Sequence, residues 1–343
     1  MENEMINNNQ TPDIVYEPPK AMTRKTKRLI FYIAMVALPF AQFLLFYVYV
    51  HANSIAMAFR VEKPLTGGGI EVYYSLTENF KMVWSFLQSA KGGVGLTNSL
   101  KNYFIGFFTS GIFSIFFSYY VYKKFFGAST FKVFLYLPSI ISGLVLINVY
   151  KELMDRVIPE FINDTFYGGE TVVFSILAEN KYTWVLAYSV FMGLGGHILM
   201  YTGAMSGINE SVVESAQLDG VNAIQEFWYI TLPLIYPTFV TFTITGIAGI
   251  FTAHPNLHTF YGLDQPISEN IHTIGFYIFA SVKEGSIISS KSPTEQQLME
   301  DYWRYERLSL TQVSALGLMI TAVMLPTTLI IKKLMTKYGP STD

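Results

Sequence analysis

The sequence contains no cysteine, which excludes disulfide bonds and thiolate metal sites. Charged residues are also scarce, since Asp, Glu, Lys and Arg account for 14% of the 343 residues, whereas a soluble globular chain usually has about 25%. This deficit, together with 16% aromatic residues, indicates a protein that faces lipid. The formal net charge of −2 provides no surplus of cations to neutralise phosphates, so we expect no nucleic-acid partner.

Motifs of catalysis are missing as well. The phosphate-binding pattern Gly-x-x-x-x-Gly-Lys-Ser/Thr does not occur, so we expect the chain to bind no ATP of its own. No pair of carboxylates or cluster of histidines supports an enzyme. His254 and His258 are four residues apart, but Pro255 interrupts the helix that would place both rings on one face. We therefore expect a pair of loop histidines, with no metal site and no catalytic residue.

Long apolar runs, by contrast, are abundant. A bilayer core of about 30 Å requires about 20 residues of helix at about 1.5 Å per residue. Six runs are close to this length, which predicts an all-α, polytopic membrane protein with six transmembrane helices. The predicted spans are residues 29–50, 100–121, 133–150, 182–203, 234–253 and 313–331.

Basic residues beside the first and last spans indicate the orientation. Five cations precede the first span, which places the N-terminus in the cytoplasm. Six spans return the C-terminus to the same side, where three lysines follow the last run. Residues 1–19 have no apolar period and are predicted to be disordered, so residues 1–28 would form a cytoplasmic tail. The first run exceeds the about 7–15 apolar residues of a signal peptide, which favours a retained anchor.

Polar and helix-breaking residues lie inside or between the predicted spans. The second span has a polar stripe, which usually faces other helices or a water-filled path. The stripe consists of Ser99, Asn102, Thr109, Ser110 and Ser114. Pro138 and Gly143 are expected to kink or loosen the third span. Residues 254–312 form a long outer segment, whose apolar patch at 271–282 predicts a short helix lying against the bundle.

A polar insert separates the fourth and fifth spans. Residues 208–232 contain no Lys or Arg but have four acidic residues, Glu210, Glu214, Asp219 and Glu226. An amphipathic helix that lies on lipid usually has Lys or Arg on its polar face. The acidic insert therefore favours docking to a basic partner surface over contact with lipid.

The turn residues of the insert predict its local structure. Asn209 is a suitable N-cap for a first helix, and Gly220 stands where that helix would end in a left-handed residue. Asn222 can cap a second short helix that runs to Ile230, after which Pro233 would open the fifth span. Two short helices joined by a sharp bend would form a knob at the membrane face, which can transmit force to a docked partner.

The insert also contains a signature. It has Glu214, Ser215 and Ala216 in succession, then Gly220 after three further residues, and after nine more it ends in Ile230, Thr231, Leu232 and Pro233. This pattern resembles the EAA signature of ABC importer permeases, the inner-membrane components of binding-protein-dependent transport systems. The departure is Ser215, where the family has Ala. Asp219 and Phe227, with the Ile-Thr-Leu-Pro ending, resemble the carbohydrate branch of that family.

The resemblance implies a type I ABC importer permease (MetI-like) fold, with a permease domain over residues 29–335 in the bacterial cell membrane. It implies that the chain is not itself an enzyme, because a cytoplasmic ABC ATPase, present in two copies, would use ATP and Mg. The other implied partners are a second permease subunit, forming a heterodimer, and an extracellular solute-binding protein. The implied substrate is a sugar or an oligosaccharide.

The same resemblance assigns roles within the insert. Residues 208–233 would be the coupling helix, held in a groove of the ATPase. Glu214 would pair with a basic residue of the ATPase, whereas Ser215 and Ala216 would allow close approach. The Leu-Pro end of the signature would tie the insert rigidly to the fifth span.

For the substrate path, the resemblance points to positions in the fourth and fifth spans. These positions are Gly193, Gly196, Gly246, Ile250 and Ala253. Additional candidates, for which lipid or helix contact is the alternative, are Tyr188, Thr243, Thr245 and Phe251.

Two other functional classes remain open, namely a permease for glycerol phosphate or a polyamine, and a secondary transporter. The latter is disfavoured because spans two to six contain few charges and no clear internal repeat.

Overall fold

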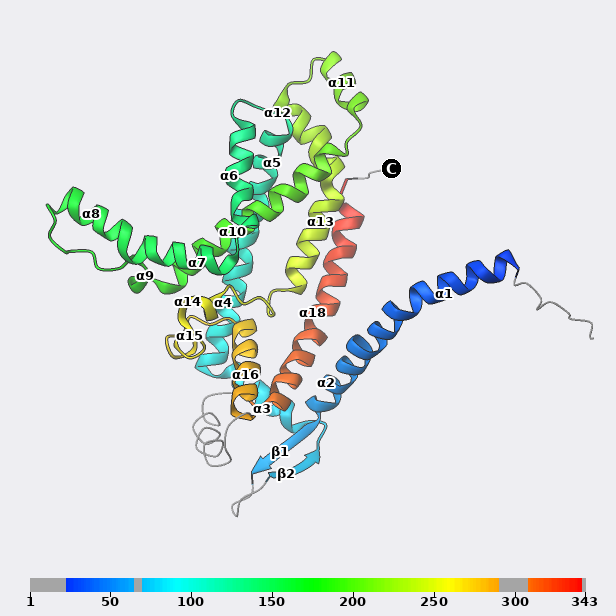
Figure 1. Ribbon diagram of the computed structural model, residues 1–343, viewed down its shortest axis with the longest axis vertical. Helices are drawn as coiled ribbons and strands as arrows, with labels where there is room; N and C mark the ends of the chain where they lie inside the picture. The colour runs from blue at the N-terminus through cyan, green and yellow to red at the C-terminus, as the bar shows by residue number, and fades with distance from the viewer. Residues whose placement is uncertain (1–22, 65–69, 290–307, 341–343) are drawn as a thin grey trace, which may run out of the picture. The chain divides into compact units, whose positions relative to one another are not determined.

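The computed structural model describes residues 23–64, 70–289 and 308–340 (Figure 1). The chain divides into two units, residues 1–54 and 55–343. Most of the predicted cytoplasmic tail, residues 1–22, lies outside the described residues.

The first unit contains an apolar helix that includes the first predicted span. α1 (Arg24–Gln42) is followed without a break by a π-helical turn, η1 (Phe43–Tyr49), and by α2 (Val50–Ala58), which passes into the second unit. Thr23 caps α1, because its hydroxyl accepts a hydrogen bond from the Thr26 N–H. The three elements form 35 residues of helix, and an 18-residue window within it has a mean hydropathy of 2.2, so the helix is long and apolar enough to cross a bilayer.

The second unit contains a β-hairpin directly after α2, which is an addition to the all-α fold predicted from the sequence. β1 (Arg60–Pro64) pairs antiparallel with β2 (Ile70–Tyr74), in a register that places Arg60 opposite Tyr74. α3 (Glu78–Gln88) follows the hairpin. The side-chain amide of Asn79, on α3, donates to the Arg60 carbonyl at 2.7 Å and so holds the hairpin against the helix.

The second predicted span lies within a continuous helix of 33 residues, Ala90–Tyr122. It consists of α4 (Ala90–Gly106), a π-helical turn η2 (Phe107–Ile112) and α5 (Phe113–Tyr122). Ser89 caps it by accepting a hydrogen bond from the Gly92 N–H. Part of the predicted polar stripe is buried against other helices; its buried members are Ser99, Ser110 and Ser114.

The third predicted span, residues 133–150, is not one straight helix. α6 (Ala128–Ile140) ends at an extended residue, Ile141, and α7 (Gly143–Glu152) then leaves at a bend of 98°. Pro138 removes a backbone donor from the last turn of α6, and Gly143 is a poor helix former. After the bend, α7 runs through η3 (Leu153–Val157) into α8 (Ile158–Phe166), so this part of the chain is longer than the sequence predicts.

The fourth and fifth predicted spans flank the polar insert. α9 (Ile176–Glu179) precedes α10 (Lys181–Ser206), which contains the fourth span. The fifth span belongs to α13 (Leu232–Ala248), and the predicted residues 249–253 leave the helix in turns. Between the two spans lie the insert elements α11 (Glu210–Leu218) and α12 (Ala223–Glu226), at the top of the view in Figure 1.

A second short helix ending at Ile230 is predicted before Pro233, but the structure has one continuous helix there. α12 (Ala223–Glu226) passes through η4 (Phe227–Thr231) into α13. The Leu232 N–H donates to the Phe227 carbonyl, five residues earlier. This wider π turn relieves the clash between a proline ring and the carbonyl four residues before it.

The outer segment is helical where the structure describes it. α14 (Leu257–Tyr261) and α15 (Gln265–Ser268) are followed by α16 (Ile274–Ser289), which includes most of the predicted apolar patch. Residues 290–307 lie outside the described residues. His254 lies in a loop as predicted, whereas His258 belongs to α14 and so is not a loop residue. Both rings contact the Phe279 ring, at centroid distances of 4.9 and 5.6 Å. The last span lies within α18 (Leu310–Tyr338).

The main core joins α7, α10, α14 and α16. Its fully buried members include Val185 and Tyr188 of α10, Leu257 of α14, and Phe276 and Tyr277 of α16. Within the described residues, five helices are long and apolar enough to cross a membrane, and the bent pair of α6 with α7 and α8 makes a sixth if it is one broken span. The chain is therefore a multi-pass membrane protein.

An ion pair on the outer segment makes part of the stability dependent on pH. The Lys181 ammonium donates to both Glu269 oxygens, at 2.6 and 2.7 Å, and the Gln265 amide donates at 2.9 Å. Lys181, followed by Gln265, lowers the pKa of Glu269. The ion pair therefore stabilises the folded chain fully above the ordinary carboxyl pKa of about 4.3. This stabilisation is lost as the pH falls through the lowered pKa of Glu269 in the folded chain.

Replacing Glu269 with Gln should lower the thermal unfolding temperature of the purified chain at pH 7, because the ion pair is lost. The difference in unfolding temperature from wild type should disappear on acidification; a difference independent of pH would contradict this assignment.

Candidate functional site

The first half of the polar insert folds as its turn residues predict. α11 (Glu210–Leu218) begins at Asn209, whose side-chain oxygen accepts a hydrogen bond from the Ser211 N–H at 3.1 Å. The helix ends before Gly220, which has a φ of 79°. This left-handed conformation costs glycine nothing and strains most residues that have a Cβ. The chain therefore bends sharply after one short helix.

A capping box begins the second half of the insert. The Asn222 side chain accepts a hydrogen bond from the Gln225 N–H at 2.9 Å, and the Gln225 side chain accepts one from the Asn222 N–H at 3.0 Å. These bonds provide partners for N–H groups that the start of a helix leaves unpaired. Because the helix then continues from Ala223 to Ala248, the second half of the insert and the fifth span form one rod.

The residues of the signature differ in their exposure. The exposed ones are Glu214, Ser215, Asp219 and Gly220, and the half-buried ones are Ile230, Leu232 and Pro233. Ala216 and Phe227 are only 8% and 5% exposed. The resemblance implies that Ala216 allows close approach by a partner, but α11 turns this residue, together with Val213, toward the interior of its own chain.

Two apolar side chains at the tip of the insert were not identified from the sequence. Leu218 and Ile224 are 89% and 71% exposed, one on each side of the Gly220 bend. Exposed large apolar groups rimmed by polar ones mark interaction surfaces. The available signal was an apolar residue on either side of a glycine within a segment that is otherwise polar.

Glu226 does not belong to the acidic exposed face that the sequence predicts. It is 2% exposed, and its carboxylate forms an ion pair with Lys123 at the end of α5. A sequence separation of 103 residues between the two partners left no local signal for this contact.

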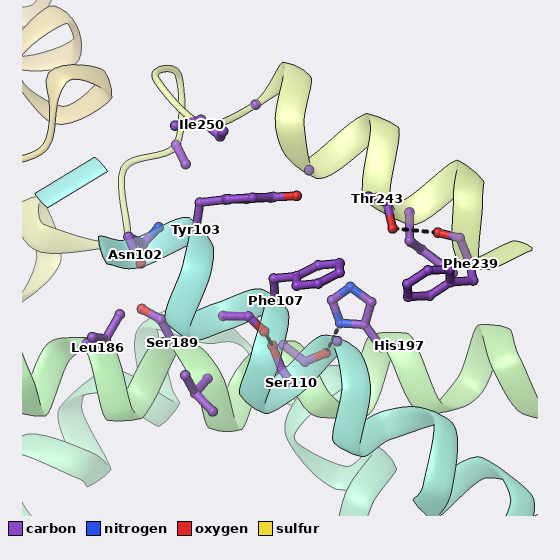
Figure 2. A pocket seen from close by; sticks show the side chains of 18 of the residues that line it. Asn102, Tyr103, Phe107, Ser110, Leu186, Ser189, His197, Phe239, Thr243 and Ile250 are labelled. Atoms are coloured by element: carbon purple, nitrogen blue, oxygen red, sulfur yellow. Dashed lines mark hydrogen bonds between the residues drawn. The ribbon is translucent and has the colours of Figure 1, made fainter. Parts of the chain in front are cut away.

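A cavity of about 330 Å³ lies between three of the membrane helices. One wall is formed by α4 and η2, the second by α10, and the third by α13 with the turns that follow it (Figure 2). The lining residues of the first wall are Asn102, Tyr103, Gly106, Phe107, Ser110 and Gly111; of the second, Leu186, Ser189, Val190, Gly193, His197 and Tyr201; of the third, Phe239, Phe242, Thr243, Gly246, Gly249, Ile250 and Ala253.

The structure brings some of the predicted path residues to this cavity and leaves others elsewhere. Gly193, Thr243, Gly246, Ile250 and Ala253 line it. The other predicted residues do not line the cavity. Tyr188 is buried in the main core between Tyr150 and Phe260. Phe251 packs with the apolar clusters around α18, and Gly196 and Thr245 are not among the lining residues.

Two of the glycines permit close packing of the cavity walls. A Cβ placed on Gly246 would lie 2.9 Å from the Tyr103 ring, and one on Gly193 would lie 3.2 Å from the Ser110 hydroxyl oxygen. Both distances are shorter than ordinary van der Waals contact. Small residues at these positions therefore let the first wall approach the other two.

His197 also lines the cavity and was not among the residues predicted from the sequence. Its Nδ1 lies 2.7 Å from the Gly193 carbonyl oxygen, which can only accept a hydrogen bond. In the neutral ring Nδ1 therefore carries the proton and Nε2 is an acceptor. Figure 2 shows the ring of His197 turned so that Nε2 faces the cavity beside Phe107.

The cavity offers aromatic faces and uncharged hydrogen-bonding groups. Tyr103, Phe107 and Phe239 provide rings, and Asn102, Ser189 and Thr243 are among the polar groups. None of its lining residues, all within the described part of the chain, is Asp, Glu, Lys or Arg. Such a surface can bind a neutral, hydroxyl-rich solute, whereas a charged solute would lose hydration without a countercharge from this chain.

Comparisons with known proteins agree with these features. Residues 128–262 match the family described as the binding-protein-dependent transport system inner membrane component. The chain is 22% identical over 161 residues to the arabinooligosaccharides transport system permease protein AraP of Halalkalibacterium halodurans, which covers 46% of this chain and 50% of that protein. It is 22% identical over 138 residues to the multiple sugar-binding transport system permease protein MsmF of Streptococcus mutans, covering 40% and 47%. The chain thus spans about half the length of the curated relatives it matches.

Solved structures extend the similarity to nearly the whole chain. A chain of a bacterial ABC transporter involved in the import of the acidic polysaccharide alginate has a TM-score of 0.67 at 18% identity, covering 92% of this chain and 98% of that one. The alginate transporter in complex with alginate pentasaccharide-bound periplasmic protein gives a TM-score of 0.65 at 20% identity, covering 91% and 96%. These comparisons agree with the resemblance found in the insert: the chain is a multi-pass membrane protein with the fold of these ABC transporter chains, and its residues 128–262 match the inner-membrane-component family.

Proposed function

We propose that this chain is the transmembrane permease subunit of an ATP-driven, binding-protein-dependent importer that carries a sugar or an oligosaccharide across the cell membrane. The observation that supports this most directly is the single helix from Ala223 to Ala248. Its first turns belong to the insert, and Phe239, Thr243 and Gly246 farther along it line the cavity. A displacement of the insert would therefore reach the cavity through a rigid rod.

The energy for transport would come from partners. Two copies of a cytoplasmic ABC ATPase, using ATP and Mg, would each hold the insert of one permease subunit in a groove, with this chain paired to a second permease. The exposed acidic residues Glu210, Glu214 and Asp219 complement a basic groove, and Leu218 and Ile224 would supply its apolar contacts. A binding protein on the outer side would deliver the substrate, and both termini would lie in the cytoplasm.

The cavity favours an uncharged sugar over the alternatives. AraP and MsmF are named for arabinooligosaccharides and multiple sugars, and the aromatic rings with Asn102, Ser189 and His197 suit hydroxyl-rich rings. A permease for glycerol phosphate or a polyamine would require charged groups opposite its substrate. The absence of Asp, Glu, Lys and Arg from the lining residues that the structure describes does not fit either solute.

His197 should contribute to substrate binding through Nε2. Replacing it with Phe keeps an aromatic ring but removes the acceptor, which should raise the substrate concentration for half-maximal uptake by about tenfold, the equivalent of one hydrogen bond. His197→Gln, which can still accept a hydrogen bond, should retain more of the affinity. The measurement is a concentration series of uptake in proteoliposomes; equal affinities for wild type and His197→Phe would remove His197 from the site.

The transport reaction itself tests the proposal. The chain would be expressed with an ABC ATPase and a second permease subunit, purified as a complex and reconstituted into proteoliposomes. Addition of the cognate binding protein and radiolabelled arabino- or malto-oligosaccharides should give uptake that requires ATP, with glycerol phosphate and spermidine as competing solutes. Failure of the ATPase to co-purify would exclude the importer, and uptake of glycerol phosphate or spermidine in place of sugar would exclude the substrate class.

A further inference from the structure

The buried ion pair between Glu226 and Lys123 connects two parts of the chain that the signature does not link. Both Glu226 oxygens accept hydrogen bonds from the Lys123 ammonium, at 2.9 and 2.8 Å. The side chains of Lys123 and Glu226 are 18% and 2% exposed. A carboxylate buried to this degree needs a countercharge, because removing one partner of a buried pair usually costs about 3–5 kcal/mol. Lys123 provides that countercharge.

Two neighbouring contacts reinforce the pair. The Tyr119 hydroxyl donates to the Ala223 carbonyl at 2.7 Å. The Phe227 ring packs against the rings of Tyr119 and Phe116, with centroids 4.9 and 5.3 Å away. Residues 116, 119 and 123 are three and four apart, so they lie on one face of the helical end. This face of α5 is therefore attached to α12 and η4 by an ion pair, a hydrogen bond and ring contacts.

The attached helices are two walls of the cavity. Phe107 and Ser110 belong to the helix from Ala90 to Tyr122, which ends one residue before Lys123. Thr243 and Gly246 belong to the helix from Ala223 to Ala248, which carries Glu226. The insert is therefore joined to the α13 wall by a continuous helix and to the first wall by Lys123 and Glu226.

The geometry points to a role for this pair as a clamp through which the insert moves the first and third cavity walls together. This inference rests on the proposed function. With the clamp intact, a push on the insert is delivered to the first wall as well as to α13. With the clamp opened, α13 would follow the insert while the first wall lagged, and ATP would be hydrolysed without opening the path. Lys123 and Glu226 are positioning residues, because neither lines the cavity.

The test is charge reversal in the complete, reconstituted transporter. Lys123→Glu and Glu226→Lys, each alone, should raise the number of ATP molecules hydrolysed per sugar imported by about fivefold or more. A change of this size corresponds to the free energies that usually couple two sites in a protein. The double variant restores an ion pair with the two charges exchanged, and it should return this ratio to within about twofold of wild type. Glu269→Gln, which opens the more exposed Lys181 pair, is the matched control and should leave the ratio unchanged. An unchanged ratio in both single variants, or no rescue in the double variant, would overturn the clamp.

A second measurement does not depend on transport. Because the chain has no cysteine, spin labels can be attached specifically at Lys124→Cys and Tyr229→Cys, on either side of the clamp. In the assembled complex their distance should stay the same with and without ATP, and should change with ATP once Glu226→Gln is added. A distance that changes equally with and without this substitution overturns the clamp, whereas absence of ATP-dependent uptake by the unmodified transporter contradicts the importer function instead.

Discussion

Replacing Leu218 with Asp should release the ATPase from the complex. Leu218 is 89% exposed at the tip of the insert, and burying a leucine in a partner groove contributes about 2 kcal/mol, or about 30-fold in affinity. An aspartate would lose this contribution and would also leave a carboxylate in an apolar contact. The fraction of ATPase that co-purifies with the tagged permease, and sugar uptake by the reconstituted complex, measure the effect.

The control for this substitution is Leu76→Asp. Leu76 lies between β2 and α3, away from the insert in sequence, and is 77% exposed. The same change there should leave ATPase binding intact, because exposed apolar residues outside an interface tolerate polar substitutes. If the Leu218→Asp variant co-purified with as much ATPase as wild type, the tip of the insert would not be the docking surface. The Glu214→Lys variant would then test whether the ATPase docks on the acidic face of α11.

Replacing Gly246 with Val should close the substrate path. A Cβ on Gly246 would lie 2.9 Å from the Tyr103 ring, so Tyr103 must move or the two walls must separate. Overpacking of this kind costs about 1–3 kcal/mol, and a valine occupies space in a cavity of only about 330 Å³. Uptake should fall by about tenfold or more. The measurement is initial sugar uptake in proteoliposomes, normalised to the amount of assembled complex.

Gly196→Val is the matched control for this substitution. Gly196 lies on α10, and a Cβ there would have no neighbouring atom within 4 Å. The sequence resemblance places Gly196 and Gly246 together on the path, whereas the structure places only Gly246 at the cavity. Uptake should therefore be nearly normal in Gly196→Val. Equal loss in both variants would show that the path passes Gly196 and that the cavity is not the substrate site.

The insert was predictable because its structure depends on local chemistry. Asn209 and Asn222 cap helices through hydrogen bonds to residues two and three positions later, and Gly220 adopts its φ of 79° because it has no Cβ. Such rules operate within a few residues. The exception was Pro233, where a π turn allowed the helix to continue although the sequence predicted a boundary.

The membrane class of the chain was also a property of the sequence alone. Apolar runs of about 20 residues can be satisfied in lipid only as helices, so composition and length led directly to the predicted spans. Pro138 and Gly143 predicted a break in the third span, which the structure has at residues 141–142. The angle of 98° between the two helices was not predictable, because it depends on packing.

The tertiary structure decided which residues face one another. Tyr188 and Thr243 were candidates for the same path, yet one is buried in the core and the other lines the cavity. Lys123 and Glu226 are 103 residues apart, and no local pattern connects them. Contacts of this kind depend on how helices pack in three dimensions. By itself the sequence therefore determined that this chain crosses the membrane and carries a bent insert, whereas helix packing decided where the cavity lies and which side chains join the insert to its walls.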